Sequence, residues 1–223
     1  QLSELQKTIS NVGTAEEFSK FIDELKDFIQ RILNHTEKLA SDFGDVKKGY
    51  LGGFVEKESN LSQLGDCWVY NDAKVYGNAR VSENAIVCVE AKVFDDAEVC
   101  GNARVCGNTN VCGDAQVYGD ARIYDYAWAF GNARINGFAQ ICGNAQVKSI
   151  GDYAVFQNNW SSGRWFTWTK SNDMWKVGCF YGTGEELIKK AYKDSEESGK
   201  KYQAIVNVVK KIASEEKKFE LTD

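Results

Sequence analysis

Residues 101–120 read GNARVC-GNTNVC-GDAQVY-GD, and this six-residue rhythm decides the fold. It continues without an insertion from Gly65 to about Lys148, which makes fourteen hexapeptides. A β-branched residue stands at the fifth position of almost every unit, and a small residue, mostly alanine, stands two positions before it. A fixed period over so long a stretch indicates a solenoid, in which each unit packs on its neighbours.

Each hexapeptide predicts a short strand followed by a corner. In Asn78-Ala79-Arg80-Val81 the small and large residues alternate with polar ones, which is the period of a strand. The Gly-Asn and Gly-Asp pairs between strands tolerate the dihedral angles of tight corners. Three such sides close a triangle, so that fourteen units build about 4.7 coils. We therefore expect a mainly β protein built on a left-handed parallel β-helix, the left hand being an exception to the usual crossover preference.

The repeat divides the chain into four segments. We expect helices in residues 1–41, a segment leading into the solenoid in residues 42–64, the solenoid in residues 65–150, and a cap in residues 151–223. The first segment carries an apolar helical stripe that includes Phe21, Leu25 and Phe28. Such a stripe needs a cover. Two interpretations stay open: the helix docks on the open end of the solenoid, or it forms an oligomerisation bundle.

The C-terminal segment is expected to plug the last coil. Residues 165–169 and 174–181 alternate in the manner of strands and predict a β-hairpin. A capping box at residues 183–186 predicts a helix that ends before Gly199, and a second helix follows over residues 200–216. A β-helix needs such a plug because its last coil otherwise exposes apolar core and unpaired strand edges.

Composition narrows the function classes. The net charge of −5 argues against a general nucleic-acid binder, which needs a basic face. The chain has no apolar run long enough to span a membrane and no signal-peptide pattern. Its seven cysteines, an odd number without a Cys-x-x-Cys pair, favour a reducing cytoplasm. Cys88 and Cys106 stack one coil apart, but ideal stacking separates their Cβ atoms by about 4.8 Å, more than a disulfide prefers, so free thiols are expected.

The segments around the array carry a family resemblance. The leading sequences DFGDVKKG (42–49), GGFVE (52–56) and NLSQLGDCWVY (60–70) are similar to those of bacterial and prophage proteins with GNARV hexapeptide repeats, which are often labelled as transferases. Residues 165–192 resemble the tail of phage-borne members. The resemblance covers about residues 42–212. It implies a left-handed β-helix and a phage or prophage origin.

The array lacks the residue that related catalysts use. Hexapeptide-repeat acyltransferases, which this array resembles, use a histidine as general base, and carbonic anhydrases of the same fold hold zinc with three histidines. The one histidine here, His35, lies outside the repeat. A base must reach the proton it removes, and zinc needs clustered ligands. We therefore expect no catalytic residue, no metal and no cofactor, with acyl transfer by Asp125 or Glu90 as the alternative.

The residue after each core position lies on the outer surface, and equivalent positions recur every third hexapeptide. Two of the three faces carry apolar columns, with Tyr70 and Tyr124 on one and Tyr76, Phe94 and Phe130 on the other. Apolar columns outside a closed solenoid indicate subunit packing. We expect a homotrimer, with a dimer as the second choice.

Arginine and tryptophan side chains are the candidate ligand-binding groups. Aromatic rings stack on bases, and guanidinium groups bind phosphates. The candidates are Arg164, Trp165, Trp168, Arg104, Arg122 and Arg134. The alternative interpretation places the tryptophans in the core of the hairpin.

These observations favour a non-enzymatic, oligomeric, cytoplasmic binding protein. It would sequester a small nucleotide-like signal or inhibit a host defence protein. An acyltransferase without the usual histidine and a structural spacer remain the alternatives. Nucleotide binding would favour the binding protein, and turnover of acetyl-CoA would favour the acyltransferase.

Overall fold

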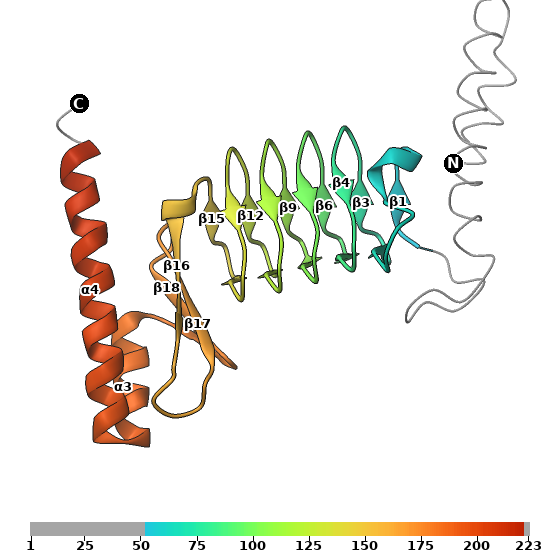
Figure 1. Cartoon of the computed structure of the whole chain (residues 1–223). Helices are drawn as coiled ribbons and strands as arrows, with labels where there is room; N and C mark the ends of the chain where they lie inside the picture. The colour runs from blue at the N-terminus through green and yellow to red at the C-terminus, as the bar shows by residue number, and fades with distance from the viewer. Residues whose placement is uncertain (1–51, 221–223) are drawn as a thin grey trace, which may run out of the picture.

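The computed structural model describes residues 52–220 and shows a column of coils with a sheet and two helices at its C-terminal end (Figure 1). The expectations for residues 1–41, including Phe21, Leu25, Phe28 and His35, fall outside the described residues. Every hexapeptide contributes one strand, as the period predicts. These strands are β2 (Trp68–Val69), β3 (Lys74–Val75), β4 (Arg80–Val81), β5 (Ile86–Val89), β6 (Lys92–Val93), β7 (Glu98–Val99), β8 (Arg104–Gly107), β9 (Asn110–Val111), β10 (Gln116–Val117), β11 (Arg122–Ile123), β12 (Trp128–Ala129), β13 (Arg134–Ile135), β14 (Gln140–Ile141) and β15 (Gln146–Val147).

The strands form three parallel sheets. The β1 sheet has the order β1-β3-β6-β9-β12-β15, the β2 sheet contains β2, β5, β8, β11 and β14, and the β4 sheet contains β4, β7, β10 and β13. Strands pair with the strand three units away, for example Val87 with Val105 and Ile123 with Ile141. The protein is therefore a parallel β-solenoid of about five turns. The left hand of the coil stays a prediction.

The segment that precedes the repeat supplies part of the first turn. Strand β1 (Phe54–Val55) pairs with β3, and Leu61 forms a bridge with Val81 on the β4 sheet. Between them lies the 3₁₀ helix η2 (Glu58–Asn60), whose Asn60 amide donates hydrogen bonds to two carbonyls of the next coil. The first coil is thus closed by residues that do not follow the hexapeptide pattern.

The core follows the repeat position by position. The alanine and β-branched positions are fully buried, as Ala103, Val105 and Ile123 illustrate. Burial of methyl groups in this column is the main favourable contribution to stability, at roughly 25 cal/mol per Å² of apolar area.

The corners require left-handed backbone. Gly101 has a φ of +71°, and a Cβ there would stand 2.7 Å from the amide nitrogen of Gly119 in the next coil. Where an acidic residue replaces glycine, its side chain joins adjacent coils. Asp125, at φ +63°, accepts a hydrogen bond from the Gly143 amide at 3.0 Å, and Asp95 does the same from Gly113 at 3.1 Å. The carboxylate of Asp125 therefore has a structural role.

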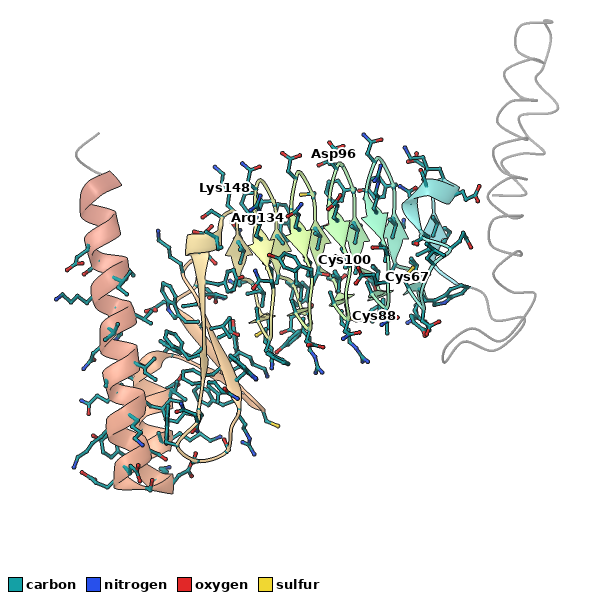
Figure 2. All side chains as sticks on the ribbon, viewed as in Figure 1. Cys67, Cys88, Asp96, Cys100, Arg134 and Lys148 are labelled. Atoms are coloured by element: carbon teal, nitrogen blue, oxygen red, sulfur yellow. A yellow bond between two sulfur atoms is a disulfide. The ribbon has the colours of Figure 1, made fainter. Side chains whose placement is uncertain are left out.

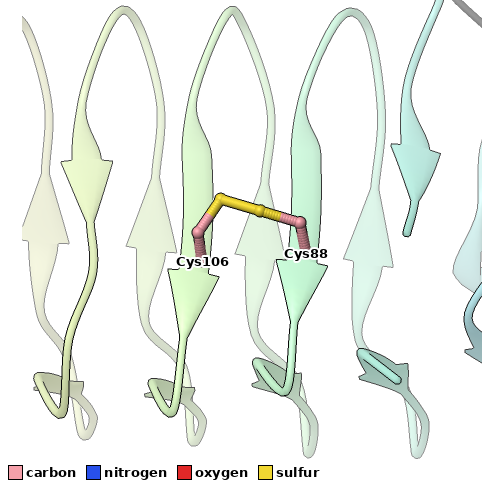
Figure 3. The surroundings of a disulfide bond; sticks show 2 residues. All are labelled: Cys88 and Cys106. Carbon is pink, nitrogen blue, oxygen red and sulfur yellow. A yellow bond between two sulfur atoms is a disulfide. The ribbon is translucent and has the colours of Figure 1, made fainter. Parts of the chain in front are cut away.

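The expectation that Cys88 and Cys106 are free thiols is wrong. They form a disulfide between β5 and β8 (Figure 3). Their Cα atoms are 4.6 Å apart, which lies within the range that disulfides span, so the ideal Cβ stacking distance was too strict a criterion. Among the other described cysteines, Cys100, Cys112, Cys142 and Cys179 are free thiols, and the buried Cys67 donates its thiol hydrogen to the Val81 carbonyl oxygen at 3.5 Å. Cytosolic thiols are generally kept reduced, so the disulfide weighs against the expected cytoplasmic location, which stays a prediction.

The C-terminal sheet is antiparallel and larger than the predicted hairpin. It has the order β16 (Tyr153–Gln157), β17 (Trp165–Thr169), β18 (Met174–Val177) and β19 (Phe180–Gly182). The hairpin of β17 and β18 is confirmed. The second predicted strand is broken at Gly178, which has a φ of +54° and turns the chain into β19.

Two helices pack on this sheet. Helix α3 (Gly184–Asp194) begins with the predicted capping box, in which Thr183 Oγ1 accepts the amide of Glu186. Helix α4 is Glu196–Glu220, so it begins four residues earlier than predicted. The break between the two helices falls at Ser195 instead of at Gly199. Gly199 lies inside α4, and a side chain there would collide with the Tyr192 ring, since a Cβ would stand 2.3 Å from the Tyr192 Cδ1.

The last coil is covered by hydroxyl groups of the C-terminal sheet. The Tyr153 hydroxyl donates a hydrogen bond to the Arg134 carbonyl oxygen at 2.8 Å and accepts one from the Asn136 amide at 3.3 Å. Thr167 Oγ1 accepts a hydrogen bond from the Gln140 amide at 2.9 Å. Ser171 Oγ accepts one from the Gln146 amide, the first of β15, at 2.7 Å. The turn η3 (Ile150–Asp152) leads the chain from the last coil into β16. The predicted plug therefore pairs the strand edges through side chains.

Neither of the described helices is both long and apolar enough to cross a membrane.

Candidate functional site

Three of the six candidate ligand residues lie in one cleft. It has a volume of about 260 Å³ and lies between the outer surface of the β2 sheet and the C-terminal sheet. We call it the solenoid cleft. Its lining residues are Asp120, Arg122, Phe138, Gln140, Arg164, Trp165 and Gly178.

One wall of the solenoid cleft is aromatic. Trp165, the first residue of β17, stacks on Phe138 with the ring centroids 4.8 Å apart and the planes at 16°. Phe138 occupies a corner of the solenoid and is 45% exposed, while Trp165 is half-buried. Stacked rings of this kind form a platform on which a flat ligand can lie.

The other wall carries positive charge. Arg122 projects from β11, and Arg164 lies over Gly178, where a Cβ would stand 3.6 Å from the Arg164 Nη1. Both arginines are exposed, and neither forms an ion pair within residues 52–220. Arg104 pairs in register with Arg122 on the neighbouring strand and extends the positive charge along the β2 sheet. Asp120 is the single carboxylate in the lining.

Two candidates lie elsewhere. Arg134 projects from β13 on the β4 sheet and does not line the cleft (Figure 2). Trp168 is only 6% exposed, and its Nε1 donates to Asp173 Oδ1 at 2.8 Å. Its burial fits the alternative interpretation of this tryptophan as a core residue, and it is closed to a ligand.

The apolar columns differ in accessibility. On the β1 sheet, the rings of Tyr76 and Phe94 stack at 5.1 Å with their planes at 2°, and Phe130 meets Trp128 edge to face at 6.4 Å. Tyr76 is 36% exposed and Trp128 is 47% exposed, so this column faces solvent in the single chain.

The column on the β2 sheet is partly covered by the chain itself. Lys176 of β18 places its Nζ 5.7 Å from the centre of the Tyr124 ring. Burial, reinforced by the nearby Cys142, raises the pKa of Tyr124 above its usual value. Tyr70 is half-buried on the same sheet, next to Trp68. This column is therefore less open to a second subunit than the one on the β1 sheet.

The corner carboxylates proposed for acyl transfer are not brought together. Asp125 bonds the next coil, whereas Glu90 lines an open groove on the β1 sheet with Lys74 and Lys92. No cluster of three or more histidine, cysteine, aspartate or glutamate side chains that could hold a metal occurs among the residues that the structure describes.

Sequence reasoning missed Phe138 and Gln140 as parts of the cleft. One signal was present: Phe138 follows Gly137 at a corner where the repeat usually has asparagine or aspartate. An aromatic residue at that position exposes a ring at the edge of the coil, and here the ring meets Trp165.

The fold and the repeat define the class: the chain is a β-solenoid repeat protein. More narrowly, it is similar to the family described as YdcK beta solenoid repeat, whose model matches residues 73–88 and 115–129. No curated protein and no solved structure matches the chain. Both matched stretches lie in the solenoid, so the similarity concerns the repeat. The second stretch contains Asp120 and Arg122 of the solenoid cleft, but neither stretch reaches the C-terminal sheet.

Proposed function

We propose that this protein is a non-enzymatic binding protein that holds a small nucleotide-like anion in the solenoid cleft. The observation that carries the proposal is a cleft lined both by the guanidinium groups of Arg122 and Arg164, which form no ion pair with a described side chain, and by the Trp165–Phe138 stack. A nucleotide presents the matching groups, since its base stacks on aromatic rings and its phosphates pair with arginine.

The resemblance to phage-borne repeat proteins supports a phage or prophage setting. In that setting the ligand is a nucleotide signal of host defence, which the protein sequesters. The inhibition of a host defence protein by direct contact is the alternative, and it predicts co-purification with that protein and no nucleotide binding.

The proposal is tested by isothermal titration calorimetry with a cyclic dinucleotide and with ADP-ribose. Saturable binding of at least one of them is expected. Arg122→Ala should weaken it by about 10- to 100-fold, because a hydrogen bond to a charged group contributes roughly 1.5–3 kcal/mol. Arg134→Ala, which removes an equally exposed arginine outside the cleft, is the matched control. Lack of binding to both ligands, or equal losses in the two variants, would refute the proposal.

We further propose that the protein assembles as a homotrimer through the β1 sheet. The exposed Tyr76–Phe94 and Trp128–Phe130 pairs support this, because an apolar column outside a closed solenoid gains stability when a subunit covers it.

The expected mass in light scattering is three times that of one chain. Tyr76→Glu should shift the protein to the monomer, since it places a charge in the apolar column. Ser82→Glu, at the equivalent position on the β4 sheet, should leave the trimer intact. A monomeric or dimeric wild-type protein contradicts this proposal.

A further inference from the structure

A second and larger cleft lies between the C-terminal sheet and the helices. It has a volume of about 420 Å³, within the range of pockets for small ligands. We call it the helix cleft. It is formed by residues 158–164, the turn between β18 and β19, helix α3 and the first turn of α4. Arg164 lines both clefts.

Two hydroxyl groups of largely buried residues line the helix cleft and donate to no acceptor among the described residues. Tyr202 is 7% exposed, and its oxygen accepts a hydrogen bond from Asn158 Nδ2 at 3.0 Å, which leaves the phenolic hydrogen unused within the described residues. Ser198 is 8% exposed, and its hydroxyl forms no hydrogen bond in the same part of the chain. Both residues line the helix cleft, so both hydroxyl hydrogens are available to an acceptor that enters it.

Positive charge surrounds these donors. Arg164 and Lys190 both line the cleft, and neither forms an ion pair with a described residue. The cleft also reaches the start of α4, where Ser195 Oγ accepts the Ser198 amide at 3.1 Å. The dipole of α4 adds a small positive contribution here, but Glu196 and Glu197 in its first turn offset it, so the positive charge of the cleft comes from Arg164 and Lys190.

One carboxylate, Asp194, lines the same cleft. It cannot contact an anion favourably, but it accepts hydrogen bonds from hydroxyl groups. The three serines Ser161, Ser162 and Ser195 add further groups that both donate and accept. The lining therefore contains groups suited to an oxyanion and groups suited to a polyhydroxyl compound.

We propose that the helix cleft binds a small sugar phosphate. The phosphate is held by Arg164, Lys190 and the hydroxyls of Ser198 and Tyr202, and the sugar hydroxyls are held by Asp194 and the other serines of the lining. A phosphate provides several acceptor oxygens, which suits the number of converging donors better than a carboxylate does. This inference goes beyond the proposed function, because it does not require the solenoid cleft to bind nucleotide.

The test is calorimetric titration of the full chain with ribose 5-phosphate, inorganic phosphate and ribose. Saturable binding of ribose 5-phosphate is expected, with weaker binding of phosphate and none of ribose. Lys190→Met and Tyr202→Phe should each weaken ribose 5-phosphate binding by at least about 10-fold, the loss of one charge-assisted or buried hydrogen bond. Lys189→Met, one position along the same helix and outside the lining, should leave it unchanged.

Arg122→Ala separates the two clefts. It should leave ribose 5-phosphate binding intact while it weakens nucleotide binding. The Lys190 side chain is exposed, so its removal does not threaten the fold, and the circular dichroism spectrum of each variant checks this. Lack of saturable ribose 5-phosphate binding overturns the proposal. It is also overturned if Lys189→Met and Lys190→Met lose affinity equally, or if Arg122→Ala abolishes binding of the sugar phosphate.

Discussion

Replacement of Ile123 by alanine is expected to lower the free energy of unfolding by about 2–5 kcal/mol, because it removes buried methyl groups and leaves a cavity. Ile123 is fully buried, and it lies in register between Val105 and Ile141 in the stack of the β2 sheet. The coils above and below Ile123 cannot approach each other to fill this cavity, because hydrogen bonds between the parallel strands fix the distance between their backbones.

Urea denaturation followed by circular dichroism measures this loss. Arg122→Ala is the matched control, because Arg122 is the preceding residue of β11 and points to solvent. Its effect should stay within about 0.5 kcal/mol. Equal losses in the two variants would mean that the alternation of inward and outward residues, on which the solenoid rests, is wrong.

The solenoid is predictable from sequence because its determinants are local and repeated. Each hexapeptide needs only a small residue, a β-branched residue and a corner. Fourteen copies of this pattern fix a single pairing register for the strands. The capping box at Thr183 is equally local, and it was confirmed. The elements that differ from the prediction depend on contacts outside the repeat. Strand β1 lies outside the repeat, and the glycine at 199 marks the close packing of Tyr192 rather than the end of a helix.

The candidate site was only partly predictable. Arg122, Arg164 and Trp165 stand out by residue type, but their meeting depends on how the C-terminal sheet docks on the β2 sheet. The helix cleft has no signal in the sequence at all. Arg164, Lys190 and Tyr202 come from a loop and two helices, and nothing in their spacing says that they converge. The disulfide was missed for another reason, because the expectation used the ideal stacking distance of the Cβ atoms, whereas the Cα atoms, 4.6 Å apart, lie within the range that disulfides span.

The double variant Tyr153→Phe, Thr167→Val is expected to lower the free energy of unfolding by about 2–5 kcal/mol. It leaves the edge groups of the last coil without partners, and an unsatisfied buried polar group costs about 1–3 kcal/mol. Thr167 is 1% exposed, so water cannot replace its bond to the Gln140 amide. Tyr153 accepts the Asn136 amide at a partly buried position, whereas its bond to the Arg134 carbonyl is exposed, so most of the loss comes from Thr167 and from the Asn136 amide.

The same urea experiment tests this prediction, with Ser171→Ala as the control. Ser171 also bonds an edge amide, that of Gln146, but the site is exposed and water can take its place, so the control should lose less than about 1 kcal/mol. The double variant should also associate end to end in light scattering, because an unpaired strand edge is a template for further pairing. If it is as stable as the wild type, the hydroxyl groups of the C-terminal sheet are not what protects the open end of the solenoid.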